Sequence, residues 1–441
     1  MTKSAPTNRR TVLASMAAAT LGTTLPGMAQ SRPELVPDSG ADQTGALQAL
    51  LDNAAASGVQ LTLPAGRILV RDLAIPGNVA IEGVPGRTVL AGLDGNVVAT
   101  IAGAGSVVLR DIGFEAGANE QALLSIDQSR DVMLDRCAFR GGTGSGLTIT
   151  GSAVTVRDCT FADHADAAIH ALDNHGLLIT GNTIAACGNA GIRIWRSEAG
   201  PDGAIVTQNR IAGIKAVGGG NGQNGNGINV FKAGGVIVAD NHISDCAFTA
   251  IRLNATNDTQ VSGNTCLNSG EVAIFSEFGF SGSVIANNIV DGAAGGISMT
   301  NFNEGGYLAV CTGNIVRNIA PLSRVNPDTT PFGISAEAEA AVTGNSISKV
   351  PGPAIAAGYG PYLRNVLVAN NVMHDILIGI AVSVAPGAGP AHIANNLIFA
   401  PERAIVGMAW SDMVETDLIA NASNYPQLTI LDNTVGETPN N

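Results

Sequence analysis

The sequence predicts an all-β, single-domain, right-handed parallel β-helix of about 12–14 coils, with three strands per coil and an N-terminal capping α-helix. A short phrase returns about every 23 residues, and each copy holds three short extended pieces separated by turn residues. The composition fits this fold, because 55 glycines accompany only 4% aromatic and 13% charged residues. Such a short repeat cannot bury a core alone, so its copies must stack, and parallel crossovers make the stack right-handed.

The first segment, residues 1–29, is expected to be a twin-arginine signal peptide. Arg9 and Arg10 precede an apolar, alanine-rich run, and Gly27-Met28-Ala29 supplies the small residues of a cleavage site. The apolar run is too short and too rich in Ala and Thr for a membrane span. We therefore expect a protein in the periplasm or secreted by the twin-arginine route, with no membrane association after signal removal. The alternative is a basic tail without a targeting role.

The segment 30–78 is expected to hold a leader, one amphipathic helix and the first strands. Asp42 or Thr44 can cap the helix, and Ser57-Gly58 ends it. A solenoid would otherwise expose an apolar end, and this helix lies at the right place in the sequence to cover it. Two strands are expected to follow, at 59–63 and 68–70.

The segment 79–441 is expected to form the coils, and its repeated phrase has two conspicuous halves. In one copy, an apolar strand ends in the triplet Asn182-Thr183-Ile184, and a Gly-Ile-x-apolar strand follows at 191–194. The asparagine should form an internal ladder from coil to coil and should also accept the left-handed bend of the corner. We assign it no catalytic role. The asparagine recurs at Asn182, Asn209, Asn241, Asn264, Asn288, Asn314, Asn345, Asn371, Asn396 and Asn433.

The early copies place Ile112, Cys137 and Cys159 where later copies have asparagine. Cys137 and Cys159 should therefore be neighbours, either as a disulfide or, as we favour, as buried free thiols. No two of the six cysteines have CxxC spacing, which argues against a zinc or iron–sulfur site. We expect no metal and no cofactor.

The N-terminal segment also carries a family resemblance. The helix and the turn Leu63-Pro64-Ala65-Gly66 resemble the cap of pectate-lyase-like and polygalacturonase-like β-helix proteins, including phage tailspikes. With the twin arginine and the repeats, the whole chain resembles a family of uncharacterised twin-arginine-translocated repetitive β-helix proteins within that superfamily. The resemblance implies the fold and leaves the activity open, since the superfamily includes lyases, hydrolases, epimerases and proteins without known catalysis.

Extra residues collect in a few coils, and insertions in solenoids often mark the binding face. Two long loops, 212–226 and 317–332, precede Gly/Ala-Ile strands, and smaller additions at 197–203 and 301–307 follow them. In those strands the isoleucine and the residue two beyond it point inward, so the residue between them points outward. Read along successive coils, the outward column is Thr148, His170, Arg193, Asn229, Arg252, Phe275, Ser298 and Ser335, then Ala356, Ala381 and Val406.

The long loops flank a stretch of this face that concentrates cations and aromatic rings. We expect a cationic groove that binds an acidic, uronate-containing polysaccharide, because guanidinium pairs with carboxylate and aromatic faces stack on sugar rings. The candidate catalytic residues are His170, Arg193, Lys232 and Arg252. The candidate substrate-binding residues are Trp195, Arg196, Asn229, Phe231 and Glu277.

If the groove is catalytic, β-elimination or C5 epimerisation of a uronate is the chemistry we expect. Both begin with removal of a proton next to a carboxylate, for which Arg252, Lys232 or His170 is the candidate base, while Arg193 with Asn229 would hold the carboxylate. Glycoside hydrolysis fits less well, because the Asn-x-Asp, Asp-Asp and Gly-His-Gly set of polygalacturonases is absent. The alternative is a non-catalytic β-helix that binds carbohydrate or acts as an envelope scaffold. A net charge of −13 disfavours nucleic acid as a partner, and we expect a monomer.

Overall fold

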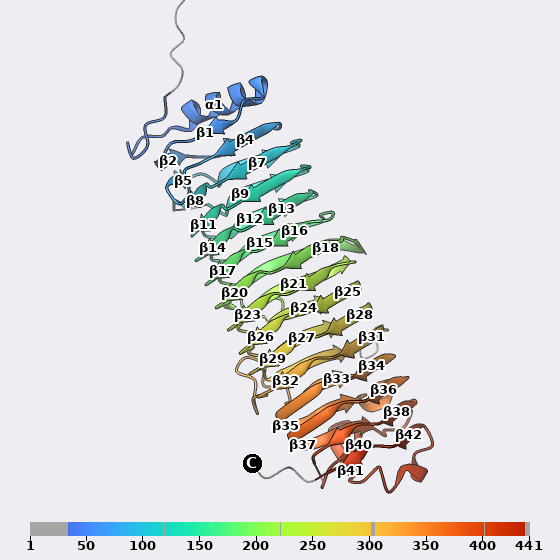
Figure 1. Cartoon of the computed structure of the whole chain (residues 1–441). Helices are drawn as coiled ribbons and strands as arrows, with labels where there is room; N and C mark the ends of the chain where they lie inside the picture. The colour runs from blue at the N-terminus through green and yellow to red at the C-terminus, as the bar shows by residue number, and fades with distance from the viewer. Residues whose placement is uncertain (1–33, 119, 221, 301–304, 401, 437–441) are drawn as a thin grey trace, which may run out of the picture.

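The computed structural model describes residues 34–436 except 119, 221, 301–304 and 401, so the predicted signal peptide lies outside the described residues. The chain forms a right-handed parallel β-helix, which confirms the predicted fold class (Figure 1). Its strands stack into three faces, named A, B and C. Along the chain, each coil contributes a strand first to face B, then to face C and then to face A. Face B holds the strands before the asparagine, face C those after it, and face A the Gly/Ala-Ile strands.

The elements of face B are β1 (Leu61–Thr62), β4 (Val79–Glu82), β7 (Val107–Arg110), β10 (Val132–Asp135), β13 (Val154–Arg157), β16 (Leu178–Thr180), β19 (Ile205–Thr207), β22 (Ile237–Ala239), β25 (Asn257–Ser262), β28 (Ser281–Ala286), β31 (Tyr307–Thr312), β34 (Ala340–Thr343), β36 (Val366–Ala369), β38 (Ala391–Ala394) and β42 (Leu428–Leu431). Face C contains β2 (Gly66–Val70), β5 (Thr88–Gly92), β8 (Gly113–Glu115), β11 (Ala138–Arg140), β14 (Thr160–Ala162), β17 (Thr183–Ala185), β20 (Arg210–Ala212), β23 (His242–Ser244), β26 (Thr265–Leu267), β29 (Ile289–Asp291), β32 (Ile315–Arg317), β39 (Leu397–Ile398) and β43 (Thr434–Val435).

Face A contains β3 (Leu73–Ala74), β6 (Val97–Ala102), β9 (Ala122–Asp127), β12 (Ser145–Thr150), β15 (Ala167–Leu172), β18 (Ala190–Pro201), β21 (Asn226–Gly234), β24 (Ile251–Asn254), β27 (Val272–Glu277), β30 (Gly295–Thr300), β33 (Ile334–Ala336) and β40 (Ile405–Ala409). Two long strands, β35 (Ser346–Ala357) and β37 (Val372–Ser383), begin in face C and end in face A. Two short 3-10 helices, η1 (Gly360–Tyr362) and η2 (Ala422–Asn424), complete the C-terminal coils.

The helix α1 (Thr44–Ser57) lies across the N-terminal end of the stack, as predicted (Figure 1). Its Leu47, Leu51 and Ala54 are buried against the first coils, and Gly58 ends it in the left-handed conformation. It is the one α-helix in the described ranges, and no helix there has the length and apolar character needed to cross a bilayer. Asp42 accepts a hydrogen bond from the backbone N–H of Thr44, so it orders the start of the helix.

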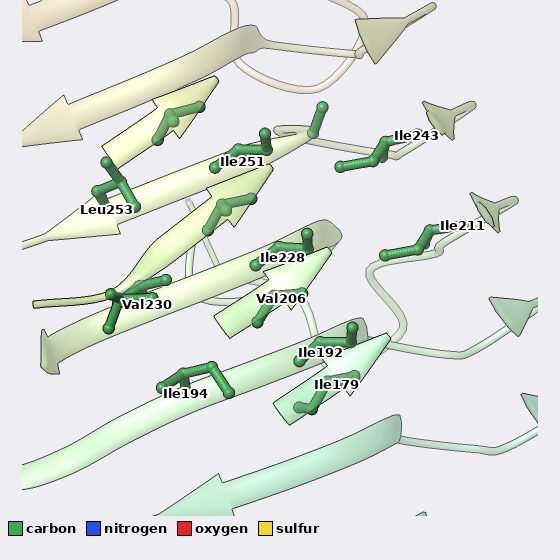
Figure 2. Close-up of a cluster of buried hydrophobic side chains, with 14 of the residues drawn as sticks. Ile179, Ile192, Ile194, Val206, Ile211, Ile228, Val230, Ile243, Ile251 and Leu253 are labelled. Carbon is green, nitrogen blue, oxygen red and sulfur yellow. The ribbon is translucent and has the colours of Figure 1, made fainter. Parts of the chain in front are cut away.

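The core is a set of apolar columns that run along the helix axis. Ile192, Ile228 and Ile251 are partners in successive face A strands, and all three are fully buried. Figure 2 shows them facing Ile179 and Val206 of face B across the interior. Since burial of such a side chain contributes roughly 1.5–3 kcal/mol, each coil adds to stability by packing on its neighbours.

The asparagine ladder is present as predicted, and it joins successive coils at the corner between faces B and C. The Oδ1 of Asn241 accepts from both the backbone N–H and the Nδ2 of Asn209, at 3.0 and 2.9 Å. Its own Nδ2 donates to the carbonyl of Val206 and to Asn264. This arrangement repeats from Asn182 to Asn433, so each side chain pairs buried backbone groups that would otherwise be unsatisfied.

One detail of the corner differs from the prediction. The ladder asparagines do not themselves adopt the left-handed conformation; the residue before each of them does, as in Gln208 (φ 58°) and Asp240 (φ 55°). The ladder side chain must point inward, and the preceding residue makes the bend, a place that suits Gly, Asn and Asp. In the early coils Cys137 and Cys159 lie next to each other as predicted, and the backbone N–H of Cys137 lies 3.4 Å from the Sγ of Cys159. All six cysteines are buried free thiols.

Face A ends in the one antiparallel pair among the described strands. β40 turns back into β41 (Asp412–Glu415), and this hairpin lies at the C-terminal end of the stack (Figure 1). Ala381 and Val406, which belong to the outward column, are buried there because Met408 and Met413 pack against them. The outer surface of face A is therefore covered at this end.

Candidate functional site

The outward column of face A has the predicted register. His170, Arg193, Asn229 and Arg252 are successive partners across β15, β18, β21 and β24. Although they point away from the core, Arg193, Asn229 and Arg252 are only 5%, 4% and 7% exposed. The long loop 212–226 lies against two of them, because Asn224 bonds to Arg193 and Gly222 packs on Arg252.

Arg193 links the strand to the loop 212–226. Its guanidinium donates to both carboxylate oxygens of Asp166, at 2.7 and 2.9 Å, and to the side-chain oxygen of Asn224 at 3.0 Å. Burial raises the pKa of Asp166, but the hydrogen bonds from Arg193 outweigh burial and lower it, so the carboxylate stays ionised. The same guanidinium lies 5.1 Å from the ring centroid of Trp195.

Arg252 is the centre of a second, more deeply buried cluster. It donates to both oxygens of Glu277, at 2.7 and 2.8 Å, and to Glu271 at 3.0 Å. The other oxygen of Glu271 accepts from the side chain of Asn326 in the loop 317–332. A Cβ at Gly222, in the other long loop, would lie 2.2 Å from Nη1 of Arg252, so only glycine allows that loop to approach so closely.

These pairings correct the predicted charge of the groove. Neither arginine presents free positive charge. One carboxylate neutralises Arg193, and two carboxylates surround Arg252. A guanidinium that already donates to two carboxylates is a poor proton acceptor, and this pairing argues against Arg252 as the base. The glutamates Glu271 and Glu277, which look scattered in the sequence, converge on it.

A pocket of about 310 Å³ opens beside this cluster, at the edge where face A turns toward face B. Five of the nine predicted site residues line it: Trp195, Asn229, Phe231, Arg252 and Glu277. The remaining walls are Gly222 and Gln223 of the long loop, Asn254, and Phe278. The structure therefore brings most of the predicted substrate-binding set together in one concave site.

The polar groups in the pocket are held in place by one another. The indole N–H of Trp195 donates to Asn229 at 3.0 Å, and the Nδ2 of Asn254 donates to Glu277 at 2.8 Å. The rings of Trp195 and Phe231 meet edge to face at 6.1 Å. Such mutual fixing reduces the ordering cost of binding a ligand.

The other predicted site residues lie around the pocket and not in its lining. His170 packs against the Trp195 ring at 5.3 Å, and its Nδ1 lies 3.4 Å from Nη1 of Arg193. Burial, and then the charge of Arg193, lower the pKa of His170, so its imidazole is neutral at pH 7. Lys232 reaches over the Phe231 ring at 5.4 Å and donates to the carbonyl of Ser197.

Arg196 lies farther along the corner and points away from the pocket lining. It donates to the carbonyls of Asn174 and Glu198, and one nitrogen is 4.0 Å from Asp202. Burial raises the pKa of Asp202 to about 6. The position of Arg196 supports a role in ordering the insertion 197–203 more directly than one in contacting a ligand.

The sequence reasoning missed Asp166, Glu271 and four residues of the pocket wall, Gly222, Gln223, Asn254 and Phe278. Asp166 and Glu271 stand in corners before face A strands, where period-two alternation gives no direction for a side chain. Phe278 follows β27, is 45% exposed and has a φ of 58°, a conformation that is unusual for a bulky residue. Alternation from the inward residue Ser276 would turn Phe278 inward as well, so alternation does not predict the exposure that the left-handed corner gives it.

Within the described ranges, no group of three or more His, Cys, Asp or Glu side chains is arranged to hold a metal ion. The carboxylates of the pocket instead use their oxygens on Arg252 and Asn254. The site therefore consists of aromatic rings in edge-to-face contact, amides and neutralised ion pairs.

Comparison with known proteins gives a family match and structural similarities. The family model described as right handed beta helix region matches residues 99–219 and 145–318. No curated protein matches the chain in sequence. A PL6 alginate lyase solved with a trisaccharide has a TM-score of 0.53 at 13% identity, over 90% of this chain and 94% of its own.

Two further structures have a similar fold. Tailspike protein 3 of bacteriophage CBA120 has a TM-score of 0.52 at 11% identity, over 92% of this chain but only 61% of its own. The catalytic domain of a GH87 α-1,3-glucanase with nigerose has a TM-score of 0.51 at 12% identity, over 83% of this chain and 69% of its own. At such identities the similarity concerns the fold. Residues 99–318 are a right-handed β-helix region, and the resemblance stated from the sequence is confirmed at the level of that fold.

Proposed function

We propose that this protein binds an acidic polysaccharide in the pocket of face A, with sugar rings stacked on Trp195, Phe231 and Phe278. The observation that carries the proposal is the meeting of these three side chains with Asn229, Asn254 and Glu277 in one concave site. Aromatic faces cover the apolar faces of sugar rings, and amide and carboxylate groups exchange hydrogen bonds with hydroxyls. The shared fold with an alginate lyase and an α-1,3-glucanase supports a carbohydrate ligand.

The preference for acidic sugars depends on Lys232. Its ammonium group stands over Phe231 at the rim, and among the described residues no carboxylate forms an ion pair with it. An ammonium that donates only to one backbone carbonyl keeps two donors for a ligand carboxylate. We therefore place a uronate carboxylate beside Lys232, and not on the paired guanidinium groups of Arg193 or Arg252.

Affinity electrophoresis tests this proposal. The protein is run through gels that contain alginate, polygalacturonate or the neutral polymer dextran, and retardation by either polyuronate is the expected result. Trp195→Ala should weaken that retardation about tenfold or more. Tyr307→Ala is the control, because Tyr307 is an exposed aromatic residue on face B that does not line the pocket. Equal retardation of the Trp195 variant and the parent protein would contradict the pocket.

A second variant tests the preference for acidic sugars. Lys232→Gln should lower affinity for polyuronates several-fold while leaving any weak binding of dextran unchanged. Added salt should reduce the difference between the parent and Lys232→Gln proteins, since the Lys232 contact is exposed. If Lys232→Gln binds both polymer classes as the parent does, uronate recognition at this rim is wrong.

A catalytic version of this function has one specific observation in its favour. His170 is neutral, adjacent to Trp195 and within 3.4 Å of Arg193, so it is the predicted site residue best suited to accept a proton. In β-elimination the base takes the C5 proton and a C4–C5 double bond forms, while the C4–oxygen bond breaks and the departing oxygen keeps its electrons and takes up a proton to become a hydroxyl. Growth of ultraviolet absorbance from unsaturated product, abolished in His170→Gln, is the expected result; in an epimerase, deuterium enters C5 instead. Binding without either signal restricts the function to binding.

Export remains part of the proposal. We propose that residues 1–29 direct the protein through the twin-arginine route to the periplasm or beyond, as in the uncharacterised family that the sequence resembles. Arg9→Lys combined with Arg10→Lys should retain the protein in the cytoplasm, measured by fractionation. The monomeric state, also a proposal, is tested by light scattering of the mature chain.

A further inference from the structure

The chain has two tryptophans, one in the face A strand β18 and one directly after the face A strand β40. Trp195 lines the pocket, and Trp410 stands in the turn between β40 and β41. Trp410 is 49% exposed, and it meets Tyr359 and Tyr362 edge to face, with ring centroids 5.2 and 6.2 Å apart. We call Tyr359, Tyr362 and Trp410 the distal aromatic cluster.

The distal aromatic cluster is held firmly in place. The six-membered ring of Trp410 lies against Gly360, where a Cβ would come within 2.5 Å of it, and Gly360 has a φ of 54°. The carbonyl of Gly360 accepts a hydrogen bond of 2.6 Å from the buried hydroxyl of Ser383. A glycine is therefore required beneath the ring, and the exposed side of the indole faces solvent.

A backbone feature links the distal aromatic cluster to the pocket. Among the described non-glycine residues with positive φ, two are aromatic: Phe278 in the pocket and Trp410 in the distal cluster, both at 58°. Most other members of that set are Asp or Asn, whose side chains tolerate the left-handed conformation. Lys232 and Ala255 have the same left-handed conformation at the corresponding corner of the two preceding coils, so the bend belongs to the coil, and the unusual feature of Phe278 is the ring placed there.

The coil register gives the separation along the axis. Ser276, Met299, Ala336 and Ala357 are successive partners, so the strands that precede Phe278 and Tyr359 are three coils apart. Phe278 and Tyr359 each stand two residues beyond their registered strand residue. At about 4.8 Å per coil the separation is about 14 Å, close to three units of an extended sugar chain.

We infer that the distal aromatic cluster is a second sugar-stacking subsite, which engages the same polysaccharide chain as the pocket. This inference rests on the proposed function of the pocket. A chain that fills the pocket and runs along the edge of face A reaches Tyr359 about three units later. The strand before Trp410 lies two coils farther on, but the Trp410 ring contacts Tyr359. Engagement of both subsites by one chain raises affinity through effective concentration, so the gain begins only with oligomers of about five units or more.

The two tryptophans make the test site-specific. Trp195→Phe leaves Trp410 as the fluorescent reporter of the distal cluster, and Trp410→Phe leaves Trp195 as the reporter of the pocket. The probes are mannuronate and galacturonate oligomers, from disaccharide to octasaccharide. We expect the Trp195 reporter to respond to short oligomers, and the Trp410 reporter only to the longer ones.

Affinity is measured in parallel with Trp410→Asn. Asparagine accepts the left-handed conformation, so this variant removes the ring without adding strain. Its affinity for the octasaccharide should fall about tenfold, to that of a tetrasaccharide, while its affinity for short oligomers is unchanged; Tyr307→Ala should change neither.

The outcomes separate the two proposals. If the Trp195 reporter responds to ligand and the Trp410 reporter stays silent with saturating octasaccharide, the second subsite is wrong and the pocket stands. If the Trp410 reporter responds to the disaccharide, the two sites act independently and the shared chain is wrong. If neither responds, the proposed function fails and the subsite fails with it.

Discussion

The asparagine corner and the outer column of face A come from the same repeat, yet they differ in how they use it. At the corner one residue type recurs on ten successive coils from Asn182 to Asn433, and each rung before the last donates to the next in the same way. On face A the outward residue changes from His170 to Arg193 to Asn229 within three coils. An interior position meets an identical neighbour on each coil, whereas an outer position meets whatever the nearby loop provides. A residue type that repeats from coil to coil therefore indicates the structural framework. A position whose residue type changes from coil to coil indicates the face where we place function.

The largest loss of stability is expected from a substitution in the buried ionic cluster of face A. Arg252→Ala leaves Glu271 and Glu277 without their cation at exposures of 3% and 5%, which should cost about 3–5 kcal/mol of unfolding free energy. The measurement is urea denaturation followed by circular dichroism. Changing both glutamates to glutamine in the same protein should recover much of the loss. No recovery would mean that Arg252 stabilises by packing and not by neutralising these carboxylates.

A rung of the asparagine ladder should cost somewhat less, because the groups it leaves unpaired are neutral. Asn241→Ala removes the acceptor of Asn209 and the donor to Val206, so we expect a loss of about 3 kcal/mol with the pocket unaffected. Asn433→Ala is the matched control at the last rung, where the side chain is less buried; about 1 kcal/mol is expected. Equal losses at both rungs would show that coupling between coils does not set the stability of the ladder.

A smaller and opposite effect is expected at the corner next to the pocket. Burial raises the pKa of Asp202 to about 6, against about 3.8 in the unfolded chain. The folded state therefore favours the protonated carboxyl, and stability falls as pH rises from about 4 to 6. Asp202→Asn should be more stable than the parent protein by about 2 kcal/mol at pH 8.

The Asp202 comparison needs thermal unfolding of both proteins from pH 4 to pH 8. The gap should shrink toward pH 4, where the carboxyl is protonated in both states. A gap that does not change with pH would show that the carboxyl is not the source of the difference.

The sequence was sufficient for the fold because every interior rule is periodic. Ile192 and Ile228 repeat their inward position, and the asparagines repeat their rung, so strand direction and register follow from alternation. The same alternation identified His170, Arg193 and Arg252 as outward and neighbouring.

The electrostatics of face A could not be predicted in the same way. The partners of the arginines come from corners and loops, namely Asp166, Glu271, Asn224 and Asn326, whose paths follow no period. Period and alternation place a side chain on a face; they do not identify the side chain that reaches it from a loop. The prediction of a cationic groove therefore counted the arginines of face A and omitted the carboxylates that pair with them.

The strict stacking register has one more consequence. Because coils can be gained or lost only as whole units, the separation between Phe278 and Tyr359 can change only in steps of about 4.8 Å. That step is close to one unit of a sugar chain, so adding or deleting a coil between the two positions would change the matching oligomer by one residue. The number of coils between the two subsites would therefore set the length of the oligomer that reaches both of them.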